Sequence, residues 1–364
     1  MRVKLEDVCE RGSSNLRQSD IEGKTGAYPI YGAAGYIGQV DFYHQEKPYV
    51  AVVKDGAGIG RTTLLPAKSS VIGTMQYLLP KDNVLPEYLC YVVQYMHLEK
   101  YFTGATIPHI YFRDYKNEFF NLDSIDNQKV IVSILSKVEQ IIECRERELK
   151  ALDDLIKARF VEMFGDPNED QIRWDEVSIG DHCFVTKLAG FEYTNYIHYE
   201  DSGDVVMVKA QNVKRGALNE KDLSYISNEV SDSLPRSQLA PGDVVMTYVG
   251  ANIGDVAIID DRHKYHLAPN VAKIRPDRSE YNSVFFMYML MMKTDYIMRN
   301  SADTAKAALG MERIRRLKVF NPPLELQHKF AAFVAQVDKS KFAVQKALDK
   351  AQLLFDSLMQ KYFG

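Results

Sequence analysis

The segment LIKARFVEMFG, residues 155–165, returns at the end of the chain as LFDSLMQKYFG, residues 354–364. Its first residue and its last two, Leu155, Phe164 and Gly165, meet identical residues 199 positions later. The same ungapped offset aligns further identical pairs upstream, namely Gln128 with Gln327, Val138 with Val337 and Leu149 with Leu348. Self-similarity at one fixed offset predicts an internal duplication of the chain.

The repeated segments are predicted to be long helices, because each runs for almost forty residues without proline or glycine. Apolar residues recur in them at heptad spacing, which is typical of a coiled-coil seam. The predicted seam comprises Leu135, Val138, Ile142, Leu149, Leu152, Ile156, Val337, Val344, Leu348, Phe355 and Leu358. Each helix would be about 55–60 Å long at 1.5 Å per residue. We expect the two helices to form an antiparallel coiled coil, which gives the duplicated chain a pseudo-twofold axis; alternatively, each packs only on its own globular domain.

A second repeat lies in the regions outside these helices. VVKDGAGIGRTTLL, residues 52–65, resembles VMTYVGANIGDVAII, residues 245–259, so that Gly56 and Gly60 align with Gly250 and Gly254. The different offset is what loop insertions between the two repeats would produce. The repeat predicts a shared tight turn, which either brings backbone N–H groups near phosphate or simply joins two strands.

The regions outside the helices are predicted to be rich in β-structure. Segments with many Val, Ile, Tyr and Thr residues, bounded by Gly, Pro or Asp, are typical of strands. They are Tyr49–Val53, Ser70–Leu79, Asp204–Val208, Asp243–Tyr248 and Asp255–Ile259, with short helices expected near Pro86–Tyr101 and Tyr281–Met298. The sequence therefore predicts an α+β protein with two β-rich domains and two long helices.

Composition and charge bound the function. The 364 residues favour about two domains, and 46% hydrophobic residues argue against disorder. The net charge of −4 counts against a simple basic DNA-binding protein, so only local basic clusters would bind nucleic acid. Four cysteines without CxxC spacing, no apolar signal core and no long apolar run favour a protein of the cytoplasm without a membrane segment.

Several fragments invite an enzymatic interpretation, and each lacks a required part. Asn321-Pro322-Pro323-Leu324 resembles the catalytic tetrad of adenine methyltransferases, but Leu324 stands where an aromatic must stack on the flipped base. The glycines from Gly56 to Gly60 match neither the dinucleotide nor the P-loop motif. The carboxylate pair of a metal nuclease is missing, and the eight histidines are dispersed. We therefore expect no catalytic residue, no metal and no cofactor.

The duplicated plan, the stretch VMVKAQNVKRGAL at residues 206–218, the two Gly-x-Ile-Gly turns and the phrase FNPPLELQHKFAAFVAQVDK at residues 320–339 carry a resemblance. Together they resemble the specificity subunits of type I restriction–modification systems, over almost the whole chain. The first repeat departs from the closing phrase, because it lacks the double proline and keeps Gln128 and the helix.

The resemblance implies a division of labour along the chain. Target-recognition domains at residues 1–125 and 166–322 would each read one half of a bipartite site in double-stranded DNA. Spacer helices at residues 126–165 and 323–364 would set the distance between half-sites and dock two methyltransferase subunits. Two restriction–translocase subunits would join for cleavage. Methyl transfer from S-adenosylmethionine would take place in the partners and not in this chain.

The candidate DNA-binding residues are basic, amide, hydroxyl and aromatic side chains near the turns, since Lys and Arg anchor phosphates while Arg, Gln and Asn also read base edges. In the first domain they are Tyr31, Lys54, Arg61, Thr62, Thr63, Lys68, His109, Tyr111, Arg113 and Lys116. In the second domain they are Lys209, Gln211, Asn212, Lys214, Arg215, Tyr248, Asn252, Lys306, Arg313, Arg315 and Arg316. Each of them could instead be an ordinary solvated surface residue.

Two other functions stay open at this point. The chain could be a coiled-coil scaffold that binds only proteins, in which case exchanging one domain would leave DNA specificity unchanged. It could also be a single-chain DNA-modifying enzyme, which the missing catalytic motifs disfavour.

Overall fold

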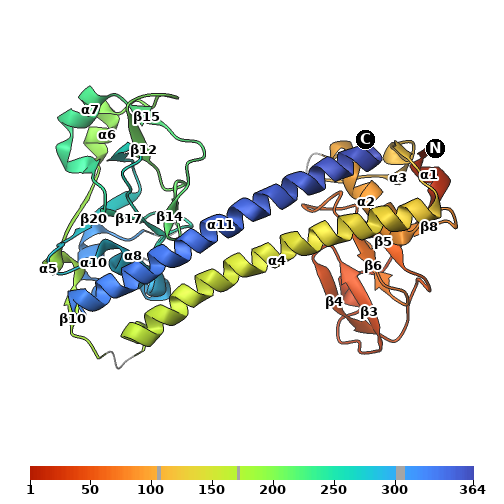
Figure 1. The fold of residues 1–364 in the computed structure, drawn as a ribbon, viewed down its shortest axis with the longest axis horizontal. Coiled ribbons are helices and arrows are strands. Elements are labelled where there is room, and N and C mark those ends of the chain that lie inside the picture. The colour runs from red at the N-terminus through yellow and green to blue at the C-terminus, as the bar shows by residue number, and fades with distance from the viewer. Residues whose placement is uncertain (105–107, 170–172, 301–307) are drawn as a thin grey trace. The chain divides into compact units, whose positions relative to one another are not determined.

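The computed structural model describes residues 1–104, 108–169, 173–300 and 308–364. The chain forms two compact units, each containing one β-rich domain and part of both long helices (Figure 1). Unit 1 comprises residues 1–148 and 344–364, and unit 2 comprises residues 149–343. The division of the sequence into four consecutive segments stays a prediction.

Unit 1 is built on one antiparallel four-stranded sheet and a smaller three-stranded sheet. The larger sheet has the order β2 (Cys9–Ser13), β8 (Met75–Pro80), β5 (Tyr49–Val53), β6 (Thr62–Leu65). The smaller sheet has the order β4 (Gly35–Val40), β3 (Tyr28–Gly32), β7 (Ser70–Val71), and β1 (Arg2–Lys4) pairs with β9 (Phe119–Asn121). The short helices are α1 (Leu5–Val8), η1 (Gln18–Asp20), α2 (Pro86–Tyr95), η2 (Leu98–Tyr101) and α3 (Phe112–Tyr115).

Unit 2 repeats this plan with additions. Its first sheet has the order β11 (Cys183–Lys187), β20 (Val271–Pro276), β17 (Val244–Thr247), β18 (Val256–Ile258). Its second has the order β15 (Tyr225–Ile226), β12 (Val205–Val208), β19 (Lys264–Leu267), β16 (Gln238–Leu239), with the ribbons β10 (Glu176–Ser178) on β21 (Lys318–Phe320) and β13 (Val213–Lys214) on β14 (Ala217–Leu218). The short helices are α5 (Ile179–His182), α6 (Gly190–Tyr196), α7 (Asn228–Ser233), η3 (Pro235–Ser237), α8 (Ser283–Met292), α9 (Thr294–Arg299) and α10 (Met311–Arg316).

The predicted internal duplication is confirmed by the order of the strands. The sheet β2-β8-β5-β6 of unit 1 corresponds to β11-β20-β17-β18 of unit 2, and all neighbours in both are antiparallel. The second sheet of each unit contains one parallel pair, β3 with β7 in unit 1 and β12 with β19 in unit 2. The repeat in the sequence is therefore a repeat of topology, and the predicted α+β class is confirmed.

Strand β5 shows how the core of unit 1 is divided. All five of its residues are buried, which is typical of a central strand covered on both faces. Val50 and Val52 face the cluster formed with α2, while Tyr49, Ala51 and Val53 face a second cluster with β7 and β8. The period-two alternation of side chains thus lets one strand serve two apolar layers.

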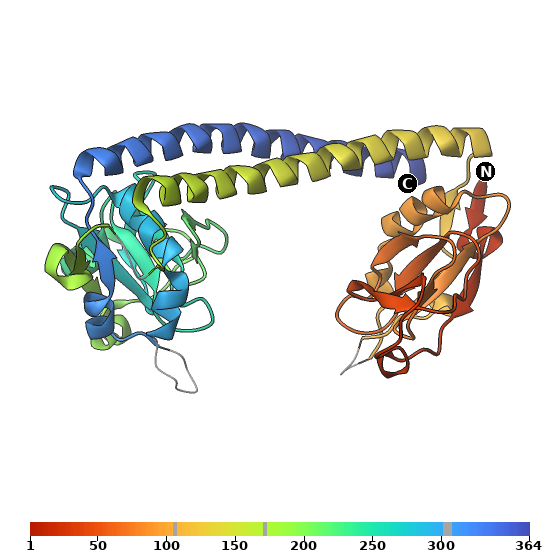
Figure 2. The same cartoon turned by 90° about the horizontal axis from the view of Figure 1, so that it is seen from below.

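The long helices are α4 (Ile125–Phe164) and α11 (Leu324–Phe363), and they lie side by side in both views (Figures 1 and 2). In unit 2, Asp153 pairs with Lys341 at 2.6 Å, and Phe160 packs on Phe330 with ring centroids 5.4 Å apart. A later residue of α4 thus meets an earlier residue of α11. The predicted antiparallel arrangement is confirmed.

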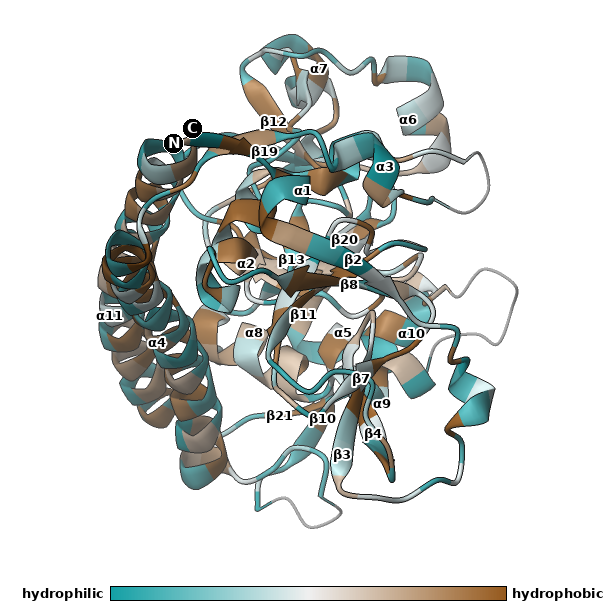
Figure 3. Ribbon diagram, turned by 90° about the vertical axis from the view of Figure 1, so that its right-hand side faces the viewer, coloured by the Kyte–Doolittle hydropathy of each residue, from teal (hydrophilic) through white to brown (hydrophobic). Residues whose placement is uncertain are grey.

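Apolar and polar residues alternate along both helices (Figure 3). Of the seam residues, Leu135, Val138, Ile156, Val337 and Val344 are buried, and Ile142, Leu149, Leu152, Leu348, Phe355 and Leu358 are half-buried. Apolar residues at the ends of the helices are more deeply buried than those in the middle of the seam, because each end also covers a β-rich domain. Phe164 packs on Phe285 in unit 2, and its repeat partner Phe363 packs on Tyr88 in unit 1.

One buried glutamine fastens the first turn of each long helix. In unit 1, Gln128 Oε1 accepts a hydrogen bond from the backbone N–H of Leu85, the N-cap of α2, at 2.8 Å. Its Nε2 donates to the carbonyls of Asn83 at 3.0 Å and Asp123 at 2.9 Å. All of its amide atoms are therefore used inside the protein, as burial requires.

Gln327 makes the same contacts in unit 2. Its Oε1 accepts from the backbone N–H of Asn282, the N-cap of α8, at 2.8 Å. Its Nε2 donates to the carbonyls of Glu280 at 2.9 Å and Pro322 at 2.8 Å. Both glutamines are fully buried, so the repeat preserves one structural joint in each unit.

We predict that Gln128→Leu lowers the free energy of unfolding of unit 1 by about 3 kcal/mol, because each buried polar group left without a partner costs about 1–3 kcal/mol. Gln327→Leu should have a similar effect on unit 2. Chemical denaturation followed by circular dichroism measures both effects. The control is Gln140→Leu, an exposed position on α4, which should change stability little. Wild-type stability in both glutamine variants would contradict the structural role of this joint.

Candidate DNA interface

The repeated glycines form the same turn in both units. Gly56 and Gly60 have φ of 92° and 81°, and Gly250 and Gly254 have φ of 100° and 87°. These left-handed conformations favour glycine over any residue with a side chain. Each turn joins an inner strand to the edge strand beside it in a four-stranded sheet, β5 to β6 in unit 1 and β17 to β18 in unit 2.

A second segment crosses each glycine turn at its start. In unit 1, the N–H of Gly56 donates to the carbonyl of Pro108 at 3.0 Å, and Asp55 forms a β-bridge with His109. In unit 2, Val249 forms a β-bridge with Ala308, and the N–H of Leu309 donates to the carbonyl of Tyr248 at 2.8 Å. A short helix follows each crossing segment, α3 in unit 1 and α10 in unit 2. We call this repeated arrangement of turn, crossing segment and short helix the turn site.

The turn site of unit 1 gathers several of the candidate residues. The Nδ1 atom of His109 lies 2.5 Å from a carboxylate oxygen of Asp55, whose other oxygen lies 3.8 Å from the amino group of Lys54. Tyr111 is 46% exposed, and the guanidinium of Arg113 lies 4.7 Å from the centre of its ring. An exposed aromatic ring, an imidazole and two basic groups thus surround one glycine turn.

The remaining candidates of unit 1 are spread around this group. Arg61 donates to the carbonyl of Ala33 at 3.0 Å, which directs it toward the β3–β4 hairpin that carries the half-buried Tyr31. Lys116 is engaged with Glu6 at 2.7 Å. Thr62 is buried, and its hydroxyl donates a hydrogen bond to the carbonyl of Gly60. Thr63 and Lys68 are exposed.

In the loop at residues 209–216, two of the residues expected to contact DNA are instead engaged within the protein. Asn212 is only 2% exposed, and its Nδ2 donates to the carbonyls of Asn219 and Lys221 at 3.0 Å each. The amino group of Lys209 donates to the carbonyl of Asp222 and to Ser224 Oγ, both at 2.9 Å. These hydrogen bonds stabilise the conformation of the loop, and the buried Asn212 is therefore not part of the proposed DNA interface.

Three further residues of this loop are exposed, namely Gln211, Lys214 and Arg215. One Nη atom of Arg215 donates to the carbonyl of Met291 at 3.1 Å, which lays this side chain along the end of α8. Gln211 and Lys214 remain the loop's candidates for contact with DNA.

The turn site of unit 2 has different side chains. Asn252 is exposed in the glycine turn, whereas Tyr248 is only 9% exposed and has the amino group of Lys187 5.5 Å from its ring centre. Burial raises the pKa of the Tyr248 hydroxyl above its usual range. Lys306 lies outside the described residues.

The three arginines of helix α10 make different contacts. Arg313 and Arg316 are exposed on one face, as the i, i+3 spacing requires. Arg315 is also exposed, with 43% of its side chain accessible, but one of its Nη atoms donates to the carbonyl of Val185 at 3.0 Å. Arg315 therefore fastens α10 to β11.

Sequence reasoning missed exposed aromatic residues and one arginine. Phe191, Tyr196 and Tyr199 on and after α6 are 66%, 49% and 41% exposed. Aromatics concentrated in the segment FEYTNYIHY, residues 191–199, were a visible signal in the sequence. Arg299, at the end of α9, gave no such signal, since only the fold brings it near α10.

Within the described residues, no group of three or more His, Cys, Asp or Glu side chains is arranged to hold a metal ion. None of the helices in the described ranges is long and apolar enough to span a membrane.

The chain resembles known proteins along most of its length. A family model described as the type I restriction modification DNA specificity domain matches residues 1–153 and 171–353. The specificity subunit of the type I restriction enzyme MjaVIII from Methanocaldococcus jannaschii is 22% identical over 337 residues, covering 83% of this chain and 76% of that subunit. The EcoBI specificity subunit from Escherichia coli is 25% identical over 166 residues, which cover 44% of this chain and 35% of that longer subunit.

Two solved structures share the fold. A type I restriction–modification S subunit from M. genitalium aligns over 100% of this chain and 96% of its own, with a TM-score of 0.61 and 15% identity. A chain from a study of complex assembly and conformational transition of the type I R-M system aligns over 100% and 97%, with a TM-score of 0.56 and 14% identity. With the family model matching most of its residues in two repeats, the chain belongs to the type I restriction–modification specificity subunit family.

Proposed function

We propose that this specificity subunit reads a bipartite site in double-stranded DNA, one half-site with each unit. The repeated turn site carries this proposal, because the two units share its backbone arrangement and differ in its side chains. Unit 1 presents His109, Tyr111 and Arg113 around its turn, while unit 2 presents Asn252 and the arginines of α10. A duplicated framework with different surface chemistry suits two different half-sites, since base-edge contacts carry the sequence information.

The proposed contacts divide into two kinds. Lys54 and Arg316 are suited to phosphate oxygens, which position a protein on DNA without reading sequence. The guanidinium of Arg113 is suited to paired hydrogen bonds with a guanine edge. The amides of Asn252 and Gln211 are suited to paired hydrogen bonds with an adenine edge. This division lets an acidic chain bind DNA through two local surfaces.

The long helices are proposed to set the separation of the half-sites. Each is continuous over 40 residues, or about 60 Å at 1.5 Å per residue. Half-sites read from one side of the duplex are separated by about 34 Å per helical turn. The helices therefore have length to span one such turn and also to attach both β-rich domains.

The same helices are proposed to dock two methyltransferase subunits, which would perform methyl transfer from S-adenosylmethionine in the cytoplasm, with two restriction–translocase subunits joining for cleavage. Leu155 and Leu354 support two equivalent docking positions. They are identical residues at matching positions of the repeat, yet they are 47% and 50% exposed and so add little to the core. A contact used once by each repeat would explain why the same exposed apolar residue stands at both positions.

The half-site assignment predicts separable effects on the DNA target. Tyr111→Ala with Arg113→Ala should relax the bases recognised in one half of the methylated motif, because a lost base contact costs about 1–3 kcal/mol of discrimination. Asn252→Ala with Gln211→Ala should relax only the other half. Methylome sequencing of a host carrying each variant with its partner subunits measures both motifs. The matched control is Arg17→Ala, an exposed residue of unit 1 outside the turn site. Relaxation of both halves by one pair of substitutions would contradict the assignment.

The docking proposal predicts a stepwise loss of partners. Leu155→Glu and Leu354→Glu should each remove one of two methyltransferase subunits, and the double variant should remove both, because a charge in an apolar contact is left without water. Native mass spectrometry of the co-purified complex counts the subunits. Val130→Glu is the control, since Val130 is also exposed on α4 but has a lysine at the matching position of α11. Retention of both partners by the double variant would rule out these positions as docking contacts.

A further inference from the structure

Three arginines from two helices of unit 2 surround one small hollow. Arg299 and Asn300 come from the end of α9, and Arg313 and Arg316 come from α10. The hollow has a volume of about 250 Å³. Arg299 stands 14 residues before Arg313 in the sequence, so the fold and not a sequence motif brings these side chains together.

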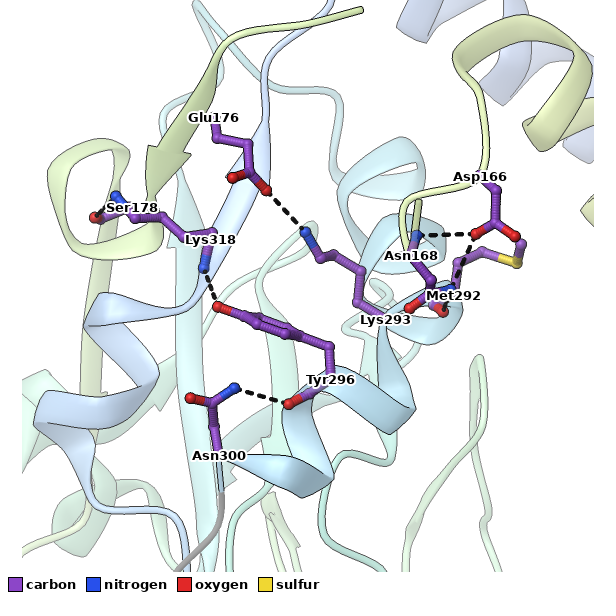
Figure 4. Close-up of polar contacts among 9 residues, drawn as sticks. All are labelled: Asp166, Asn168, Glu176, Ser178, Met292, Lys293, Tyr296, Asn300 and Lys318. Carbon is purple, nitrogen blue, oxygen red and sulfur yellow. Dashed lines mark hydrogen bonds and ion pairs between the residues drawn. The ribbon is translucent and has the colours of Figure 1, made fainter. Parts of the chain in front are cut away.

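Helix α9, which carries Arg299, is held in place by polar contacts along its length (Figure 4). At its start, the buried amino group of Lys293 lies 3.4 Å from a carboxylate oxygen of Glu176 on β10. The hydroxyl of Tyr296 accepts a hydrogen bond from the backbone N–H of Lys318 on β21 at 3.2 Å. The amide of Asn300 donates to the carbonyl of Tyr296 at 2.8 Å, which closes the helix end beside Arg299.

Helix α10 is held by its opposite face. Ile314 and Leu317 are buried in the core of unit 2, and Arg315 donates to the carbonyl of Val185 on β11. Arg313 and Arg316 consequently project from the outer face. One Nη atom of Arg313 donates to the carbonyl of Asn300 at 3.1 Å, which joins α10 directly to the end of α9.

The charge around the hollow is strongly positive. Among the described residues, Glu312 is the carboxylate that pairs with this group, at 3.1 Å from Nε of Arg316. Glu312 is 64% exposed and also lies 3.6 Å from Arg315, so it is shared between two guanidinium groups. Such a pair is weakened by solvent and is readily exchanged for a stronger anion.

We propose that Arg299, Arg313 and Arg316 bind one backbone phosphate of duplex DNA. Guanidinium groups suit phosphate because two parallel N–H groups match two phosphate oxygens. Three of them on two fixed helices are arranged before binding, which lowers the entropic cost of the contact. The site anchors the DNA beside the glycine turn of unit 2, because Gly254 of that turn lies so close to α9 that an added Cβ would be 3.4 Å from the side chain of Ile297. This inference rests on the proposed function and adds a residue, Arg299, that positions the duplex without reading its sequence.

The test compares the salt dependence of DNA binding by the chain co-purified with its methyltransferase subunits. Fluorescence anisotropy measures the dissociation constant over a series of KCl concentrations, for one duplex with the methylated bipartite motif and one with scrambled sequence. We expect the triple variant R299Q/R313Q/R316Q to reduce the slope of log K against log salt by about 0.9, the value for one lost phosphate contact. The reduction should be equal for both duplexes. Arg313→Lys should retain more affinity for DNA than Arg313→Gln.

Arg262→Gln is the matched control, because Arg262 is an exposed arginine of unit 2 already paired with Asp260 and Glu220 at 2.5 Å each. It should leave the slope unchanged. An unchanged slope in the triple variant overturns the inference, while the proposed function stands if the variant still prefers the motif duplex. Failure of the wild-type complex to prefer that duplex overturns the proposed function instead. A further outcome is that inorganic phosphate raises the thermal stability of the wild type and not of the triple variant, while both have the same salt slope for DNA binding. The hollow then binds a free anion and not DNA, which also overturns the inference.

Discussion

Each long helix is fixed at its first turn by one buried glutamine, and the rest of each unit is arranged around that joint. Gln128 and Gln327 hold the N-terminus of a long helix against the N-cap of a short helix, α2 or α8, that covers the main sheet. A carboxamide suits this place because it supplies one acceptor and two donors without a charge. Three hydrogen bonds to backbone atoms therefore hold the first turn of α4 or α11 on its β-rich domain.

The duplication shows which parts of a unit must stay constant and which are free to change. The joint glutamines, the positive-φ glycines and the phenylalanines Phe164 and Phe363 serve the same structural purposes in both repeats. Side chains around the turn sites have diverged, since His109 faces the turn in unit 1 and Ala308 takes the matching place in unit 2. A backbone framework that keeps its own hydrogen bonds internal leaves the outward side chains free to vary.

The sequence predicted the features that depend on periodicity and failed on those that depend on contact across the fold. Heptads and the absence of glycine and proline located α4 and α11 within one or two residues of their ends. Nothing local distinguished Asn212, a buried loop residue, from an exposed Asn such as Asn252. Arg315 and Arg316 are adjacent and chemically identical, yet Arg315 donates to the carbonyl of Val185 on β11, whereas Arg316 has 78% of its side chain exposed and pairs with Glu312. Three-dimensional direction, and not residue type, decides such cases.

The acidic net charge becomes compatible with DNA binding once charge is considered by location. The segment at residues 311–318 carries Arg313, Arg315, Arg316 and Lys318 against the single acid Glu312. Several acidic residues elsewhere are engaged in ion pairs, as Asp243 is with Arg275 and Glu6 with Lys116. At physiological salt, exposed charges separated by more than about 8 Å are largely screened. A phosphate at the end of α9 therefore responds to the nearby guanidinium groups and hardly at all to the net charge of the chain.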